Sequence, residues 1–138
     1  MTRSVLLDTG PLVAILSRRD SSHRVCVEQL RTIAPPLLTC WPVITEAAWL
    51  LRQQPVAVQR LLLSFTKGWI KLLPLDEQDA KPIGTILRRY RKLNAQLADA
   101  ALVHLAERER VDTIFTLDRR DFSVYRFSGN RNFHLLPE

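Results

Sequence analysis

The chain has 138 residues, of which 46% are apolar and 25% are charged. This length and balance predict one globular domain, residues 1–138, that is large enough to bury a hydrophobic core. Single acids interrupt the longest apolar stretches, so none reaches the ~20 residues that span a bilayer, and no secretory cleavage site follows the N-terminus. We therefore expect a cytoplasmic protein with no membrane association.

The formal net charge of +6 narrows the classes of partner. A basic surface favours a polyanion such as nucleic acid, and a solubilising surface or a docking face for an acidic protein are the alternatives. Cys26 and Cys40 are the two cysteines and form no CxxC pair. We interpret them as reduced thiols in the core of a cytoplasmic protein.

The first half of the chain alternates short apolar runs with helical patterns. Residues 3–8 predict a buried strand, and the helix that follows includes Pro11, a residue that suits a first helical turn. Gly68 is the predicted stop of the fourth helix. The predicted strands are 3–8 and 37–40, and the predicted helices are 11–16, 22–33, 41–51 and 55–67.

The second half continues the alternation. Asp76 is a candidate cap for a long helix, and Asn94 breaks the helical pattern before the next one. The predicted strands are 69–75, 113–117 and 133–137, the predicted helices are 77–92 and 97–109, and residues 118–121 form a predicted turn. This order predicts an α/β fold with a mainly parallel sheet.

Three carboxylates lie alone inside apolar runs: Asp8 in LLDTGPLVAIL, Glu46 in VITEAAWLL and Asp99 in LADAALVHLA. Removing an ion from water costs several kcal/mol, whereas a domain is stable by only ~5–15 kcal/mol. No Lys or Arg lies within four residues of any of the three acids. Either distant basic residues fold against these acids, or the acids converge on a cation.

Strand ends and helix faces predict where the acids meet. Asp8 ends the first predicted strand and Asp118 follows the strand TIFTL, so both point into the crevice at the carboxyl ends of the strands. Glu46 shares a helix face with Trp49 and Leu50, and Asp99 shares one with three apolar residues of its own helix. We interpret both faces as core-facing. Oxygen ligands of this kind suit Mg²⁺ or Mn²⁺.

Each candidate also has a structural interpretation. Asp8 is a possible helix cap, Glu46 a possible partner of a distant arginine, and Asp118 fits turn chemistry in LDRRD. Asp121 fits a capping or orienting role better than a ligand role. The three histidines, His23, His104 and His134, lack metal-site spacing, and we expect them to lie at the surface or pair with other groups.

These motifs, taken in register, resemble the PIN-domain ribonucleases, and in particular the VapC-type toxins of toxin–antitoxin pairs. The motifs are LLDT at a strand end, a lone Glu on a helix, ADAALVHLAE, and T-x-D followed by Asp-Phe. The resemblance implies a PIN-like, Rossmann-like sheet flanked by helices. It also implies a catalytic metal site of Asp8, Glu46, Asp99 and Asp118, in which Thr116 positions the last acid or a water. The chain departs from many relatives at Gln96, where they carry Asp.

The implied activity is hydrolysis of RNA phosphodiester bonds with one or two Mg²⁺ or Mn²⁺ ions. The resemblance further implies a homodimer and a VapB-type antitoxin that blocks the site. Basic residues near the acids are candidates for contacts with the RNA backbone, with a solvated surface as the alternative. These candidates are Arg88, Arg89, Arg91, Lys92, Arg119 and Arg120.

Rival functions fit the chain less well. Asp8-Thr9-Gly10 matches the aspartic-protease triplet, but those enzymes use a glycine-rich all-β scaffold and this chain has four glycines. A D-x-D phosphotransferase fails because Gly10 replaces the second acid, and a receiver domain needs adjacent acids after the first strand. The alternative that remains is a non-catalytic PIN-like module that binds RNA or docks a protein.

Overall fold

The computed structural model describes residues 3–138, and a parallel sheet of five strands lies at its centre. The strand order is β3-β2-β1-β4-β7, and every neighbouring pair is parallel. The strands are β1 (Leu6–Leu7), β2 (Leu37–Thr39), β3 (Ile70–Leu72), β4 (Thr113–Phe115) and β7 (His134–Leu136). The expected α/β class with helices around a parallel sheet is confirmed.

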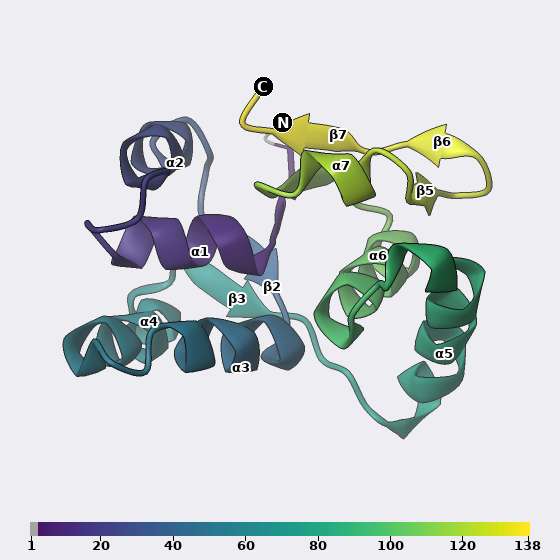
Figure 1. Ribbon diagram of the computed structural model, residues 1–138, viewed down its shortest axis with the longest axis horizontal. Helices are drawn as coiled ribbons and strands as arrows, with labels where there is room; N and C mark the ends of the chain where they lie inside the picture. The colour runs from purple at the N-terminus through teal and green to yellow at the C-terminus, as the bar shows by residue number, and fades with distance from the viewer. Residues whose placement is uncertain (1–2) are drawn as a thin grey trace.

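The helices flank this sheet (Figure 1). In that view α3 and α4 run along one side of the molecule, and α5 packs on α6 at the other end. The α-helices are α1 (Thr9–Leu16), α2 (His23–Leu30), α3 (Trp41–Leu50), α4 (Pro55–Lys67), α5 (Ala80–Arg89), α6 (Leu97–Glu109) and α7 (Arg119–Phe122). No helix within residues 3–138 is long and apolar enough to cross a bilayer.

The core follows from the apolar strands and from α6. Leu6, Leu7 and Ile114 are fully buried in the central strands, because parallel strands are covered on both faces. Seven residues of α6 are buried as well, more than in any other helix of residues 3–138. Cys26 and Cys40 are free and buried, as predicted. The acid Asp99 is therefore carried by a rigid, central element.

Several boundaries differ from the prediction. The expected helix 77–92 is divided into a 3-10 turn η1 (Glu77–Asp79), α5, and a second 3-10 turn η2 (Arg91–Leu93) that ends at Asn94 in the left-handed conformation. The expected turn at 118–121 is the short helix α7. The second helix ends at Leu30 rather than near residue 33. Gly68 has φ +81° and ends α4, as predicted.

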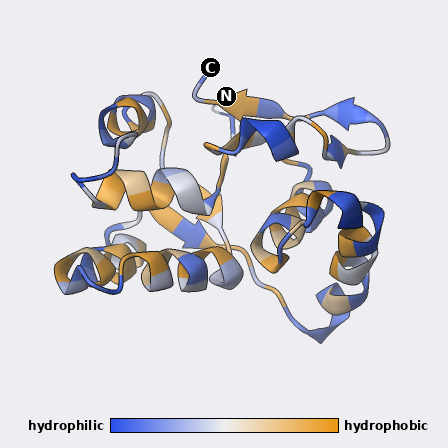
Figure 2. Ribbon diagram, viewed as in Figure 1, coloured by the Kyte–Doolittle hydropathy of each residue, from blue (hydrophilic) through white to orange (hydrophobic). Residues whose placement is uncertain are grey.

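One element was not predicted. A two-stranded antiparallel hairpin, β5 (Arg126–Phe127) and β6 (Arg131–Asn132), precedes β7. Figure 2 shows that α7 and this hairpin are mostly hydrophilic, whereas the strands of the central sheet are largely hydrophobic. Strands this short leave no apolar alternation in the sequence, so the period of two that identifies a strand is missing.

Candidate active site

Asp8 lies at the carboxyl end of β1, where its side chain is almost completely buried. Its Oδ2 accepts a hydrogen bond of 2.7 Å from the Thr116 hydroxyl. Although Asp8 occupies the position before α1, its side chain makes no capping hydrogen bond to that helix. The helix-cap interpretation is therefore wrong, and the carboxylate is held toward the neighbouring strand β4 instead.

Thr116 joins the ends of two adjacent strands. Its hydroxyl donates to Asp8 and accepts a hydrogen bond of 3.0 Å from the backbone N–H of Asp118. A side chain that bonds both acids fixes their relative placement at the edge of the sheet. The role of Thr116 in positioning the last acid or a water stays a prediction, and these two hydrogen bonds are the contacts on which it would depend.

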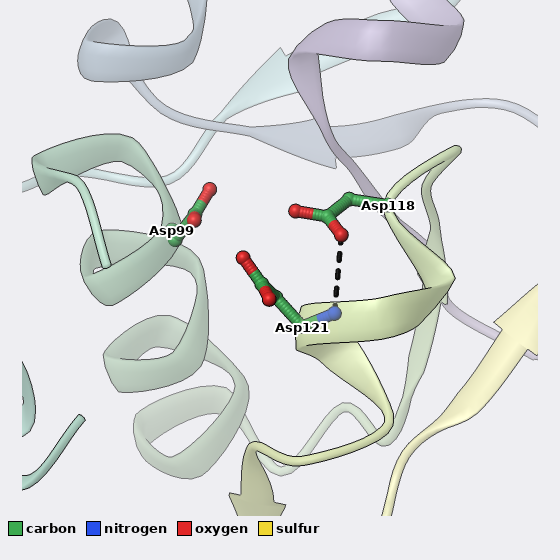
Figure 3. A group of neighbouring side chains, drawn as sticks. All are labelled: Asp99, Asp118 and Asp121. Atoms are coloured by element: carbon green, nitrogen blue, oxygen red, sulfur yellow. Dashed lines mark hydrogen bonds between the residues drawn. The ribbon is translucent and has the colours of Figure 1, made fainter. Parts of the chain in front are cut away.

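Asp99, Asp118 and Asp121 form the closest group of acids (Figure 3). Each offers a carboxylate oxygen, and these oxygens lie within 4.8 Å of one another. Asp99 projects from the first turn of α6, and Asp121 lies on α7, where its backbone N–H donates to Asp118 Oδ1 at 3.1 Å. Asp121 was expected to cap or orient, yet its carboxylate faces the same space as the other two.

Glu46 reaches this space from α3, but not from a core-facing stripe. Trp49 is 62% exposed and Leu50 is 54% exposed, so the face that they share with Glu46 is directed outward. The predicted burial of this face is wrong because α3 is apolar on more than one side, and Val43 and Ala47 supply its buried side. Glu46 is only partly buried.

All these acids line one cleft of about 590 Å³. Gln96, the residue before α6, also lies in its wall. Gly10 permits the close approach that shapes it, because a Cβ there would lie 3.3 Å from the Cβ of Leu117. The lining residues are Asp8, Thr9, Gly10, Glu46, Leu50, Asn94, Gln96, Asp99, Leu117, Asp118 and Asp121.

The cleft disfavours negative charge in two ways. Burial is the main cause that raises the pKa of Asp8 to about 7, with repulsion from Asp99 and Glu46 adding to it against the hydrogen bond from Thr116. Burial likewise raises the pKa of Asp99 to about 6, and Asp118 and Glu46 add repulsion. Burial and the nearby Asp118 raise the pKa of Asp121. Carboxylates crowded in a low-dielectric cleft behave in this way.

No basic side chain within residues 3–138 forms an ion pair with these acids, although the charge of the exposed Arg120 counteracts part of the rise in the pKa of Asp121. Within residues 3–138, no Lys, Arg or His nitrogen lies within 4.0 Å of a carboxylate oxygen of Asp8, Glu46, Asp99, Asp118 or Asp121. The interpretation of Glu46 as the partner of a distant arginine is therefore wrong for this part of the chain. The Thr9 hydroxyl in the cleft wall is also buried without a hydrogen-bond partner. Oxygen ligands with an excess of negative charge fit a divalent cation such as Mg²⁺ or Mn²⁺.

Sequence reasoning missed Tyr125. This residue is fully buried, and its hydroxyl donates a hydrogen bond of 3.1 Å to Asp99 Oδ2. Burial and the Asp99 carboxylate raise the pKa of Tyr125, so the phenol keeps its proton as the donor. No motif or spacing marks a tyrosine 26 residues from its partner.

The basic candidates divide into two groups. Exposed side chains of the end of α5 and of η2 line a shallow hollow of about 660 Å³ that borders Leu93 and Val124. These are Arg88, Arg89, Arg91 and Lys92. Arg119 instead donates to the carbonyl oxygen of Pro137, whereas Arg120 is exposed beside Asp121.

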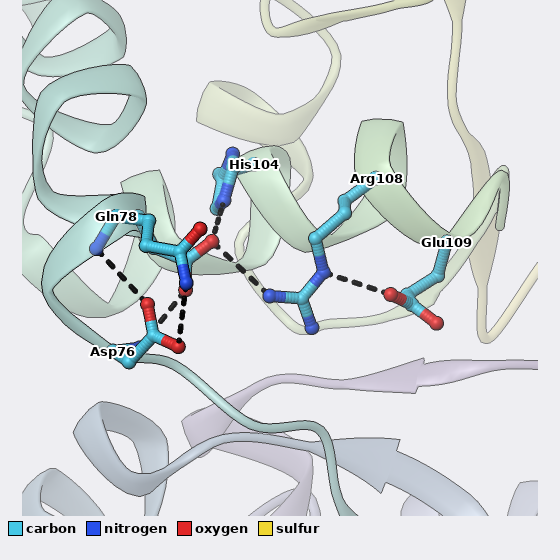
Figure 4. A network of polar contacts seen from close by, with 6 residues as sticks. Asp76, Gln78, His104, Arg108 and Glu109 are labelled. Carbon is cyan, nitrogen blue, oxygen red and sulfur yellow. Dashed lines mark hydrogen bonds and ion pairs between the residues drawn. The ribbon is translucent and has the colours of Figure 1, made fainter.

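A separate acid, Asp79, lies outside the cleft and accepts hydrogen bonds from three partners, Asp76, His104 and Arg108, which Figure 4 labels. Its Oδ1 accepts from His104 Nε2 at 2.7 Å and from Arg108 at 3.1 Å, and both of these side chains come from α6. Its Oδ2 accepts from the backbone N–H of Asp76 at 2.9 Å. The hydrogen bond with His104, followed by that from Asp76, lowers the pKa of Asp79 to about 2. His104 thus has the pairing role expected of it.

The sequence also matches a known protein family and a known protein. The PIN domain family model matches residues 5–128. Ribonuclease VapC26 from Mycobacterium tuberculosis is 30% identical over 135 residues, which cover 96% of this chain and all of the relative.

Two solved structures share the fold. The chain is similar to M. tuberculosis VapC20, described as a sarcin-ricin loop cleaving toxin, with a TM-score of 0.78 and 14% identity over 85% of this chain and 92% of that one. It is also similar to VapBC2 from Rickettsia felis bound to a promoter DNA fragment, with a TM-score of 0.63 and 13% identity over 95% and 97%. The chain therefore belongs to the PIN-domain family and, within it, to the VapC ribonucleases.

Proposed function

We propose that the protein is a divalent-metal-dependent endoribonuclease and the toxin component of a toxin–antitoxin pair. The observation that carries the proposal is the convergence of five acids on one cleft in which, among residues 3–138, no basic side chain pairs with them. A protein of marginal stability does not keep such repulsion without a compensating use. The relationship to a VapC ribonuclease indicates that this use is RNA cleavage.

Asp8, Asp99 and Asp118, with Glu46 and Asp121 beside them, would hold one or two Mg²⁺ or Mn²⁺ ions. A bound divalent cation supplies Lewis acidity toward a phosphoryl oxygen and lowers the pKa of a water ligand. The protein's own part is to hold the carboxylates in register. Thr116 does this for the two strand-end acids, because its hydroxyl bonds Asp8 and the backbone of Asp118.

The basic hollow offers a path for the RNA backbone. Its residues in η2 come immediately before Asn94 and Gln96, which line the acidic cleft. Positive side chains beside the cleft would bind the phosphates that flank the scissile bond, while the acids bind the reacting one through the cation. Arg120 lies on α7 next to Asp121.

We infer a protein partner as well. A VapB-type antitoxin is the expected inhibitor, since R. felis VapBC2 shares this fold. An inserted arginine would meet the unpaired negative charge of the cleft. We also propose that the protein forms a homodimer.

RNA cleavage by the purified protein tests the proposed activity. We expect cleavage of a mixed RNA substrate with Mg²⁺ or Mn²⁺, no cleavage with EDTA, and recovery when the metal is restored. Arg120→Gln is expected to weaken RNA binding and reduce its salt dependence without abolishing cleavage.

The opposite results would redirect the assignment. Cleavage that continues in EDTA would contradict the metal-dependent mechanism. RNA binding without cleavage, under every metal condition, would favour the non-catalytic module instead.

A further inference from the structure

The buried phenol of Tyr125 contacts an acid of the cleft, Asp99, from the protein interior. Its hydroxyl donates to Asp99 Oδ2, and no other side chain within residues 3–138 forms a hydrogen bond with that carboxylate. A carboxylate has two oxygens, so this bond leaves Oδ1 for the space shared with Asp118 and Asp121. Figure 3 shows that these three acids face one another across that space.

The position of the Tyr125 hydroxyl is itself fixed. The ring packs edge-on between Phe122, at 4.9 Å, and Tyr90, at 4.8 Å between centroids. Its backbone N–H donates to the carbonyl oxygen of Asp121 at 3.1 Å. Tyr90 is held in turn, because its hydroxyl accepts the backbone N–H of Arg126 at 3.0 Å. The phenol therefore has little freedom to turn away from Asp99.

Tyr125 thereby connects the two elements that carry the clustered acids. Asp99 lies on α6, whereas Tyr125 is fixed by its backbone to α7, which carries Asp121 and follows Asp118. A rigid donor between the helices sets where the Asp99 carboxylate lies relative to the other two. Hydrogen-bond partners behind metal-binding carboxylates orient the ligands in this way.

We propose that Tyr125 is a positioning residue that fixes the Asp99 carboxylate opposite Asp118 and Asp121 and so tightens the binding of the divalent cation. This inference rests on the proposed metal-dependent function. A purely structural role would need the aromatic ring alone, because the ring fills the space between Phe122 and Tyr90. The positioning role needs the hydroxyl, and the structural role does not.

Calorimetric titration of the metal-free protein with Mn²⁺ separates these roles. Tyr125→Phe keeps the ring and removes the hydroxyl, and we expect its Kd for Mn²⁺ to rise by about ten-fold. Thr85→Val is the control, because it removes an exposed hydroxyl that bonds only the carbonyl oxygen of Lys81 and neither Asp99 nor the rings around Tyr125, and its Kd should equal that of the wild type. In the Asp99→Asn background, Tyr125→Phe should produce no further change.

The outcomes distinguish this inference from the proposed function. A wild type that binds no Mn²⁺ would overturn both. Mn²⁺ binding that is equally tight in the wild type and Tyr125→Phe would overturn only the role of Tyr125. If Tyr125→Phe does not fold, Phe122→Leu gives a second test, because it loosens the ring but keeps the hydroxyl. Its Kd must also rise, and an unchanged Kd would contradict the inference.

Discussion

Two aspartates, Asp79 beside α6 and Asp99 on it, have opposite environments. Asp79 accepts hydrogen bonds from His104 and Arg108 of that helix, and its pKa is lowered to about 2. Asp99, on the first turn of the same helix, faces other acids and has a pKa raised to about 6. The residue type is the same and both acids contact or lie on α6, but their neighbours differ.

This difference separates a structural carboxylate from a functional one. The Asp79 network satisfies its charge internally and joins η1 and α5 to α6. The cleft leaves its charge to be satisfied from outside, by a cation or by an inserted basic group. Acids whose pKa values are raised together in one cleft indicate a functional site, whereas lowered values in a paired network indicate stabilisation.

The largest effect is expected from Asp99→Asn. The substitution keeps the shape of the side chain but removes a metal-binding charge, so RNA cleavage should fall by about 1,000-fold, equivalent to several kcal/mol of transition-state stabilisation. Asp79→Asn is the matched control on the other side of the comparison. A folded Asp79→Asn protein should retain cleavage. If Asp99→Asn instead cleaves RNA at close to the wild-type rate, Asp99 is not part of the mechanism.

The pH dependence of metal-free stability should be opposite in the two regions. Asp8 has a folded-state pKa of about 7, above its ordinary value of 3.8, so the native state binds more protons between these values. The free energy of unfolding therefore falls as the pH rises from about 4 to about 7, by up to ~4 kcal/mol. Denaturant titrations in EDTA, repeated across this pH range, measure the free energy of unfolding.

Asp8→Asn isolates this contribution. At pH 8 it should make the metal-free protein more stable than the wild type, and at pH 4 the difference should vanish. The Asp8 and Asp99 titrations are coupled, so the pH midpoint belongs to the cleft as a whole. A variant that is less stable than the wild type at pH 8 would show that the Asp8 charge is compensated.

Asp79 should show the reverse dependence. Its folded-state pKa lies below the ordinary value, so its stabilising contribution is complete above about pH 4 and is lost as the pH falls toward 2. Asp79→Asn should lower the Tm at pH 7 by a few degrees, because His104 and Arg108 lose their partner. Thermal unfolding followed by circular dichroism measures this loss, and an unchanged Tm would mean that the network adds nothing to stability.

The smallest effect is expected from Glu46→Gln. Glu46 reaches the cleft from the exposed side of α3 and is only partly buried. Its removal should reduce the Tm increase produced by Mn²⁺ less than Asp99→Asn does. Equal reductions in the two variants would place Glu46 among the principal ligands.

The sequence predicted the order of the main strands and helices because each of these elements depends on local signals. The apolar runs of β1 and β4 placed Asp8 and Asp118 at strand ends, and Gly68 marked the end of α4 correctly. The same reasoning failed at Trp49 and Leu50, because an apolar residue on a helix does not reveal whether its face is covered. Tyr125 could not be found because its contact with Asp99 depends on how α7 packs against α6.

The thermal unfolding temperature at pH 8, in EDTA and in excess Mg²⁺, tests most directly whether the cleft is a site for a divalent cation. At about 100 times the Kd, binding to the native state adds ~2.7 kcal/mol, so the Tm of the wild type should rise by roughly 5–10 °C. Asp99→Asn should show little of this increase. Equal unfolding temperatures of the wild type in EDTA and in Mg²⁺ would contradict the account.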